Sequence, residues 1–176
     1  MKLVAPALLL ASTISAAAGA LAQAPTLVKD VFPGASATAA AGVRFERFLG
    51  VSGGRAFVEG REPYPSQALA LWATDGTTTG STRLLNLDLS YGPGVDVGGT
   101  FYFGASGPAG TELWRSNGTA PGTSLVAHVS SLTSYSDLWP LTAVGGRLFF
   151  SADDGVHGRE LWTSDGTAAG TMLVRD

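Results

Sequence analysis

Leu161-Trp162-Thr163-Ser164-Asp165-Gly166-Thr167 decides the fold of this chain, because nearly the same stretch occurs at two earlier places. The earlier copies are Leu71-Trp72-Ala73-Thr74-Asp75-Gly76-Thr77 and Leu113-Trp114-Arg115-Ser116-Asn117-Gly118-Thr119. In each copy two variable positions, a glycine and a serine or threonine follow, and an apolar pair comes shortly after them. Self-similarity at an interval of this length indicates a repeat protein.

A pair of glycines recurs in step with this stretch. In Gly53-Gly54, Gly98-Gly99 and Gly145-Gly146 the first glycine lies 15 to 18 residues before the leucine of Leu-Trp. Two glycines between apolar runs predict a tight hairpin, because both can adopt a positive φ without steric cost. Asp-Gly and Asn-Gly predict the next turn. Each unit therefore reads as four short antiparallel strands, and we expect units at about residues 26–82, 83–124 and 125–176.

The strand after each glycine pair predicts how the sheets pack. Phe101-Tyr102-Phe103 and Leu148-Phe149-Phe150 place apolar or aromatic side chains on both faces, whereas a sheet with one wet face alternates apolar and polar residues. We therefore expect an all-β, β-propeller-like array of four-stranded antiparallel units. A β-sandwich or a β-solenoid is the alternative architecture.

The first 22 residues have the features of a secretory signal peptide. Met1-Lys2 precedes an apolar run from Leu3 to Ile14, and Ala20-Leu21-Ala22 supplies the small residues for cleavage after Ala22. The apolar run is shorter than the roughly 20 residues that cross a bilayer, and no later segment qualifies. We expect a secreted or cell-surface protein with a repeat domain at residues 23–176 and no transmembrane segment after signal removal.

Charge and cysteine content narrow the possible partners. The chain has 11 basic and 14 acidic residues, and loss of Lys2 with the signal leaves 10 − 14 = −4. Neither sign is clustered, and a nucleic-acid surface would need a basic stripe. The chain has no cysteine, so an exported domain of this kind is held together by packing or by association rather than by disulfides.

The two ends of the repeat domain share one phase of the repeat. Thr26-Leu27-Val28-Lys29-Asp30 matches Met172-Leu173-Val174-Arg175-Asp176. Three units are fewer than the four or more blades of closed propellers, and an open array exposes strand edges and an apolar face. We therefore expect either a fragment of a longer array or completion by self-association.

The repeated pattern resembles the ELWxxDGT repeat family, which occurs in secreted bacterial proteins and is also described as hyalin-like. Residues 144–167, followed by Gly170-Thr171, carry the fullest match. The resemblance implies a propeller-like fold and a surface location, and it implies no established chemistry. The first two units depart from the pattern, with Ala70 at the glutamate position and Asn117 at the aspartate position.

The residues that define the repeat are expected to be structural. A large aromatic at one position of each unit favours packing between sheets with its indole N–H bonded to the backbone, although tryptophans can also stack on carbohydrate. The Asp/Asn-Gly pairs favour turns closed by side-chain oxygens. These structural residues are Trp72, Asp75, Gly76, Trp114, Asn117, Gly118, Trp162, Asp165 and Gly166.

Acidic residues supply the candidates for other chemistry. Asp153, Asp154 and Asp165 are weak calcium candidates, since extracellular calcium sites use acidic, glycine-rich loops. Asp153, Asp154, His157 and Glu160 form the densest polar cluster, for which a hairpin loop is the favoured interpretation and a metal or acid/base site the alternative. We expect Glu112 and Glu160 to form salt bridges with arginines on neighbouring strands.

The inventory favours a non-enzymatic module for adhesion or ligand binding. The chain has no G-x-S-x-G, H-E-x-x-H or P-loop motif, so no catalytic residue and no cofactor beyond calcium is predicted. The partner is not identified; a cell-surface protein, a carbohydrate or a second copy of the chain would each fit. The alternatives are a fragment of a secreted propeller enzyme such as a glycosidase, and a piece of a longer repeat protein without a function of its own.

Overall fold

A computed structural model describes most of the repeat region. The described residues are 43–62, 65–77, 79–86, 88–89, 92–107, 110–130, 138, 140–156 and 158–175. The expected signal peptide at residues 1–22 and the strand expected at residues 26–30 lie outside this part of the chain.

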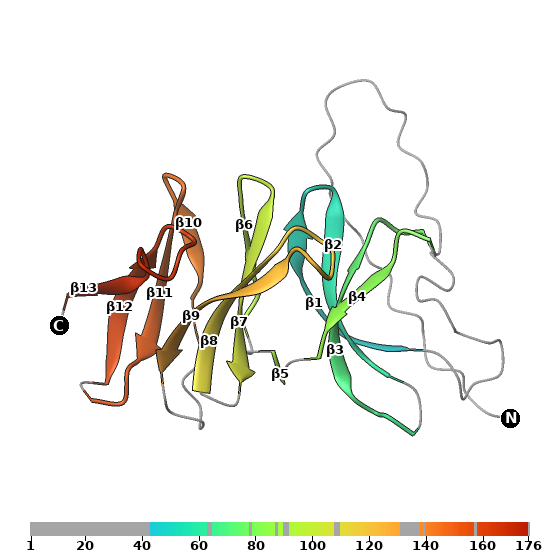
Figure 1. Cartoon of the computed structure of the whole chain (residues 1–176), viewed down its shortest axis with the longest axis horizontal. Coiled ribbons are helices and arrows are strands. Elements are labelled where there is room, and N and C mark those ends of the chain that lie inside the picture. Colours follow the sequence, from blue (N-terminus) through green and yellow to red (C-terminus); the bar gives the residue numbers. More distant parts are fainter. Residues whose placement is uncertain are drawn as a thin grey trace, which may run out of the picture.

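The described residues form three antiparallel β-sheets (Figure 1). Sheet 1 has the order β1 (Arg44–Ser52), β2 (Arg55–Arg61), β3 (Leu69–Thr74), β4 (Thr82–Leu85). Sheet 2 contains β5 (Asp88–Leu89), β6 (Val95–Val97), β7 (Thr100–Gly107), β8 (Gly110–Ser116) and β9 (Thr123–Ser130). Sheet 3 has the order β10 (Thr142–Val144), β11 (Arg147–Asp153), β12 (Arg159–Ser164), β13 (Met172–Arg175). Every regular element in the described part is a strand, which confirms the predicted all-β class.

The glycine pairs form the hairpin turns that the sequence predicts. Gly53 and Gly54 have φ of 55° and 74°, and the flanking Ser52 and Arg55 pair across the turn between β1 and β2. The equivalent pairs before β7 and β11 also have positive φ. A two-residue turn of this kind matches the right-handed twist of its strands, which fixes the register of all three hairpins.

Two details differ from the expected units. β5 was not expected, and it pairs with one end of β7 while β6 pairs with the other. The unit boundaries expected at residues 82 and 124 fall inside β4 and β9. Sheets 1 and 2 therefore end later than expected, because the strand that carries the apolar pair, β4 or β9, is the last strand of its own sheet.

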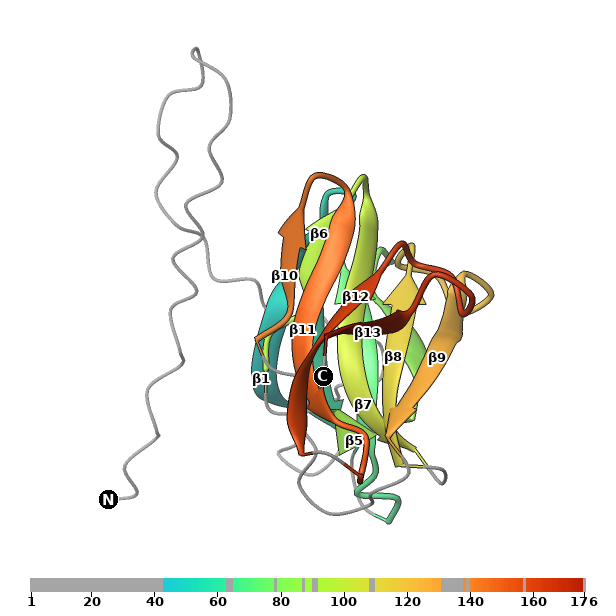
Figure 2. The ribbon, with the colours of Figure 1, turned by 90° about the vertical axis from the view of Figure 1, so that its left-hand side faces the viewer.

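The three sheets stack face to face along the molecule (Figures 1 and 2). We call the surface of a sheet that faces the sheet before it the front face, and the opposite surface the rear face. Between sheets 1 and 2 the rings of Phe57 and Phe101 stack with centroids 4.1 Å apart. The strands that lead into the glycine pairs are neighbours, since β6 contacts both β1 and β10.

Each gap between sheets encloses a hydrophobic core made by a rear face and a front face. Sheet 1 contributes the rear-face residues Phe57, Leu71, Ala73 and Leu84 to the first core. The front face of sheet 2 fills the same core with Phe101, Phe103, Ala105 and Trp114. The second core is built in the same way, with Tyr102, Leu113 and Val126 of sheet 2 against Leu148, Phe150, Ala152 and Trp162 of sheet 3.

Candidate interaction face on the third sheet

The Asp-Gly-Thr loops are closed by their own side chains. Asp165 Oδ1 accepts hydrogen bonds from the Thr167 amide at 2.9 Å and the Thr167 hydroxyl at 2.7 Å. The Gly170 amide donates to the same hydroxyl at 3.0 Å. The loops of Asp75 and Asn117 repeat this arrangement. An amide oxygen serves as well as a carboxylate oxygen here, which explains why Asn117 fits the same loop.

A pair of hydroxyls anchors each loop to its sheet. Ser164 Oγ and Thr171 Oγ1 lie 2.7 Å apart, and the Gly166 amide donates to Ser164 Oγ at 3.0 Å. Thr171 Oγ1 also donates to the Thr167 carbonyl at 2.7 Å. Buried polar groups are tolerated when they are bonded in this way. The serine and threonine positions of the repeat are therefore parts of one turn.

The loop carboxylates are committed to these turns. Thr167, through its hydroxyl and then its amide, holds the pKa of Asp165 below its ordinary value, and Thr77 does the same for Asp75. Among the described residues, no group of three or more histidine, cysteine or acidic side chains could hold a metal ion. The geometry of these loops therefore supports a turn role more than a calcium role.

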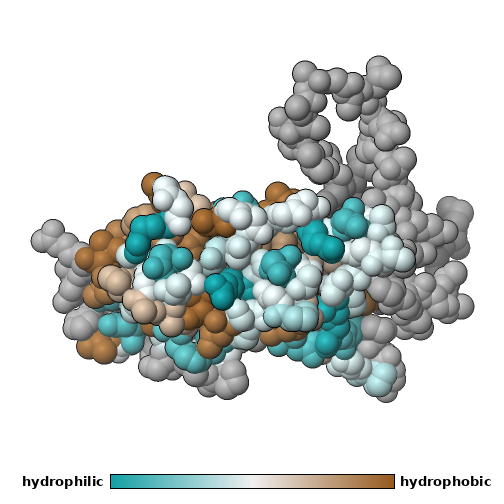
Figure 3. Space-filling view, turned by 45° about the horizontal axis from the view of Figure 1, so that its top comes forward, coloured by the Kyte–Doolittle hydropathy of each residue, from teal (hydrophilic) through white to brown (hydrophobic). Residues whose placement is uncertain are grey.

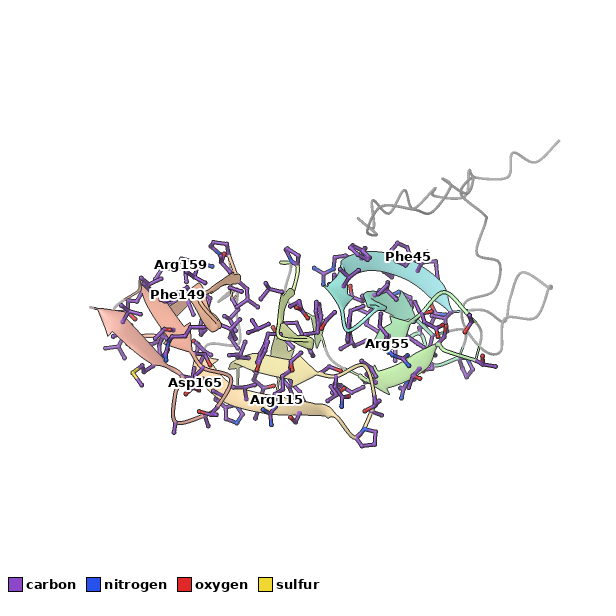
Figure 4. The ribbon with its side chains drawn as sticks, turned by 90° about the horizontal axis from the view of Figure 1, so that it is seen from above. Phe45, Arg55, Arg115, Phe149, Arg159 and Asp165 are labelled. Carbon is purple, nitrogen blue, oxygen red and sulfur yellow. The ribbon has the colours of Figure 1, made fainter. Side chains whose placement is uncertain are left out.

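Two of the three loops also join neighbouring sheets. A Cβ built on Gly166 would lie 2.2 Å from the Tyr102 hydroxyl of sheet 2, and one on Gly118 would lie 2.5 Å from Arg55 Cδ of sheet 1. Arg115 of sheet 2 donates to the Gly166 carbonyl at 3.5 Å, and Figure 4 shows this side chain beside the Asp165 loop. These glycines are needed both for their positive φ and for close packing between sheets.

The repeat tryptophans lie on front faces. Trp114 packs against the first core and Trp162 against the second. Trp72 is buried with Val58 and Ala70 on the front face of sheet 1. Trp114 Nε1 donates to Glu112 Oε2 at 2.9 Å, so the expected bond to the backbone is wrong for this residue.

Glu112 has a histidine partner where an arginine was expected. Its Oε1 lies 3.2 Å from His128 Nδ1 of the neighbouring strand β9, and its carboxylate is buried. Gly107 makes room for this carboxylate, since a Cβ there would lie 2.2 Å from Oε2. Glu112 therefore joins a tryptophan and a histidine, and the expected salt bridge to arginine is wrong at this position.

The acidic cluster of the third unit is divided between two faces. Asp153 and Asp154 accept hydrogen bonds from the amides of Gly155 and Val156, each at 2.8 Å, as in a hairpin loop. Glu160 pairs with Ala152 on the front face, whereas Asp153 is the next residue along and points to the rear face. His157 lies outside the described residues. Asp153 and Glu160 therefore do not converge on one site.

The rear face of sheet 3 is the outer face of the stack, and no other described sheet covers it. The strand pairings make Leu161 equivalent to Leu71 and Leu113, and Val174 equivalent to Leu84 and Val126. Leu71 and Leu113 are 0% exposed, whereas Leu161 is 47% exposed. Leu84 and Val126 are each 7% exposed, whereas Val174 is 46% exposed.

Further apolar side chains extend this outer face. The residues Val144, Phe149, Leu161, Met172 and Val174 share it by strand register. All of these except the half-buried Phe149 are exposed. Figure 2 looks onto sheet 3, and Figure 3 shows hydrophobic residues on the surface at the same end of the molecule. The sequence motif did not identify this face, because the motif marks the core positions of every unit alike.

Comparison with protein-family models, with curated proteins and with solved structures found no match to this chain. In the part of the chain that the structure describes, no helix is long and apolar enough to cross a membrane. The assignment of function therefore depends on the faces and loops described above.

Proposed function

We propose that this chain is an exported, non-enzymatic repeat module that binds a partner at the cell surface. Its sheets are proposed to be blades of a β-propeller-like array of the ELWxxDGT type. The face-to-face stacking of the sheets and the neighbouring positions of β1, β6 and β10 support this arrangement.

The observation that carries the proposal is the exposure of apolar side chains on the outer face of sheet 3. Leu161 and Val174 of this face are nearly half exposed, while their equivalents in the other sheets are buried. Soluble proteins seldom expose several large apolar side chains together on one sheet face unless that face meets a partner. The outer face is therefore the proposed contact surface for adhesion or ligand binding.

The arrangement of the carboxylates supports binding over glycoside hydrolysis. A glycosidase needs two carboxyl groups facing each other across a cleft at about 5 to 10 Å. Asp75 and Asp165 are bonded within their own turns, and Asp153 and Glu160 lie on opposite faces of sheet 3. The acids of the repeat thus act in turns and in packing.

A binding experiment with a matched pair of variants tests the proposal. Residues 23–176 carrying a fluorescent label are applied to bacterial cell envelopes and to a carbohydrate array. Leu161→Arg should reduce binding about tenfold or more, because a charge replaces an apolar contact, whereas Val156→Arg, at an exposed turn position of the same sheet, should leave it unchanged. Equal binding by both variants and the unmodified chain would remove the outer face from the proposal.

Export and calcium have separate tests. Mass spectrometry of the protein recovered from outside expressing cells should give an N-terminus at Gln23, as cleavage after Ala22 requires. Isothermal titration with calcium should show no heat of binding at millimolar concentration, because the loop oxygens are already bonded within the turns. An intact Met1 outside the cells, or a saturable calcium signal, would contradict these two parts of the proposal.

A further inference from the structure

The two cores inside the molecule define what a rear face of this repeat accepts. In both, an aromatic ring, a leucine and a second aliphatic side chain of one sheet receive the front face of another. The receiving sets are Phe57, Leu71 and Leu84 in sheet 1, and Tyr102, Leu113 and Val126 in sheet 2. The inserted front faces carry a phenylalanine, a tryptophan and small residues, such as Phe150, Trp162 and Ala152.

A loop reinforces each of these contacts. The glycine after Asp or Asn in the later sheet lies directly on the rear face of the earlier one, Gly118 on Arg55 and Gly166 on Tyr102. Gly118 and Gly166 are buried by this contact. A front face and a glycine loop thus dock together as one surface.

The outer face of sheet 3 carries the receiving set a third time. Phe149, Leu161 and Val174 occupy the positions of Tyr102, Leu113 and Val126. We propose that this face is a docking surface for a further four-stranded sheet of the same repeat. This inference rests on the proposed function, since it names the partner of the same face.

A second copy of this chain fits the face less well than such a partner. The front face of sheet 1, which a second copy would have to offer, is buried at Val58, Ala70 and Trp72, with Val43 and Phe45 packed against it. Phe48 and Val51 of the same face are exposed, so the obstacle lies at Val58 and Trp72, the positions that correspond to the inserted Phe150 and Trp162. A partner sheet with an open front face meets no such obstacle. Pairing of two outer faces with each other is the remaining arrangement for two copies, and the experiment below detects it.

The test supplies the partner sheet in the same chain. A copy of residues 129–176 is attached directly after Asp176, because Asp176 occupies the repeat position of His128. Tethering gives the added sheet a high effective concentration, so that weak docking still registers. The added copy is joined by protein ligation in ¹⁵N-labelled form, so that its peptides differ in mass from the identical peptides of the original sheet 3. Hydrogen exchange is then followed by mass spectrometry in β12 and β13 of the original sheet 3.

Docking should slow exchange in β12 and β13 about tenfold or more relative to the chain without the extension. Leu161→Arg in the extended chain should abolish this protection, and so should alanine in place of the added tryptophan that corresponds to Trp162. Val156→Arg should leave the protection intact. No added protection, or protection that survives both disruptive changes, would overturn the proposal.

Light scattering of the chain without the extension completes the test. A monomer agrees with a face reserved for a partner sheet, whereas a dimer that Leu161→Arg dissociates would overturn the proposal in favour of paired outer faces. The proposed function has a separate readout, and it is refuted if the chain shows no binding to cell envelopes or carbohydrates. Protection of β12 and β13 by the added sheet would still support the docking proposal in that case.

Discussion

The rear face of sheet 2 and the outer face of sheet 3 are built alike and differ in what covers them. Leu113 and Leu161 occupy the same register position of equivalent strands, yet the first is fully buried and the second is nearly half exposed. Residue type and strand pairing therefore do not decide burial in this repeat. The presence of the next sheet decides it, so that one pattern serves as core in one place and as contact surface in another.

The glycines that follow Asp or Asn in the three loops also differ in burial, and here the exposed one is in sheet 1, at the opposite end of the stack. Gly118 and Gly166 are buried against the preceding sheet, whereas Gly76 is exposed and a Cβ on it would meet nothing within 4 Å. All three have φ between 84° and 92°. All three loops thus require a positive φ at this glycine, whereas the lack of space for a Cβ arises only where two sheets meet.

Truncation of the two leucines should give the largest difference. Leu113→Ala removes a fully buried side chain and should lower the free energy of unfolding by about 2 to 5 kcal/mol. Leu161→Ala should lower it by less than about 1 kcal/mol, because its side chain is already partly in water. Urea unfolding of both variants measures the difference, and similar losses would show that the outer face is covered after all.

Alanine at two of the glycines should give a smaller difference. Gly76→Ala should cost about 1 kcal/mol, since alanine resists the positive φ. Gly166→Ala carries the same strain and must also displace Tyr102, which should add about 1 to 3 kcal/mol. Thermal unfolding of the two variants measures the gap, and equal midpoints would mean that the loop does not press on sheet 2.

The pH dependence of the loops should give the smallest effect. Hydrogen bonds from Thr167 lower the pKa of Asp165 in the folded state, so its contribution is present above the unfolded pKa, near about 4. That contribution is lost as the pH falls through the lowered folded value. Asp165→Asn should weaken the acid sensitivity of the thermal midpoint, and Asn117→Asp should increase it. An unchanged acid profile in both variants would contradict this account.

The strands and turns could be predicted from the sequence because their causes are local. Glycine pairs with positive φ and Asp-Gly-Thr loops closed by their own hydroxyls need no distant partner. β5 could not be predicted, since two residues carry too little pattern. The histidine partner of Glu112 was also missed, because it depends on a bulge between Thr111 and Glu112 that sets the register of β9.

The candidate site was the part that the sequence could not locate. The repeat motif predicts a covered rear face in every unit, and only the arrangement of sheets shows that Leu161 and Val174 remain exposed. An open array implies an exposed apolar face, but the repeated sequence does not identify the residues of that face. For the acidic cluster that includes Asp153 and Glu160, a hairpin loop was the favoured prediction and a metal or acid/base site the alternative, and strand alternation places these two side chains on opposite faces of sheet 3.

Thiol labelling at the two equivalent leucines compares the covered rear face of sheet 2 with the outer face of sheet 3 in the folded protein. The chain has no cysteine, so Leu113→Cys and Leu161→Cys each introduce one reactive group, and a maleimide reports its access to solvent in the folded protein. The thiol at 161 should react at least about a hundredfold faster than the thiol at 113, whose exposure requires opening of the structure. Equal protection at both positions would contradict it, because the outer face of sheet 3 would then be covered as the rear face of sheet 2 is.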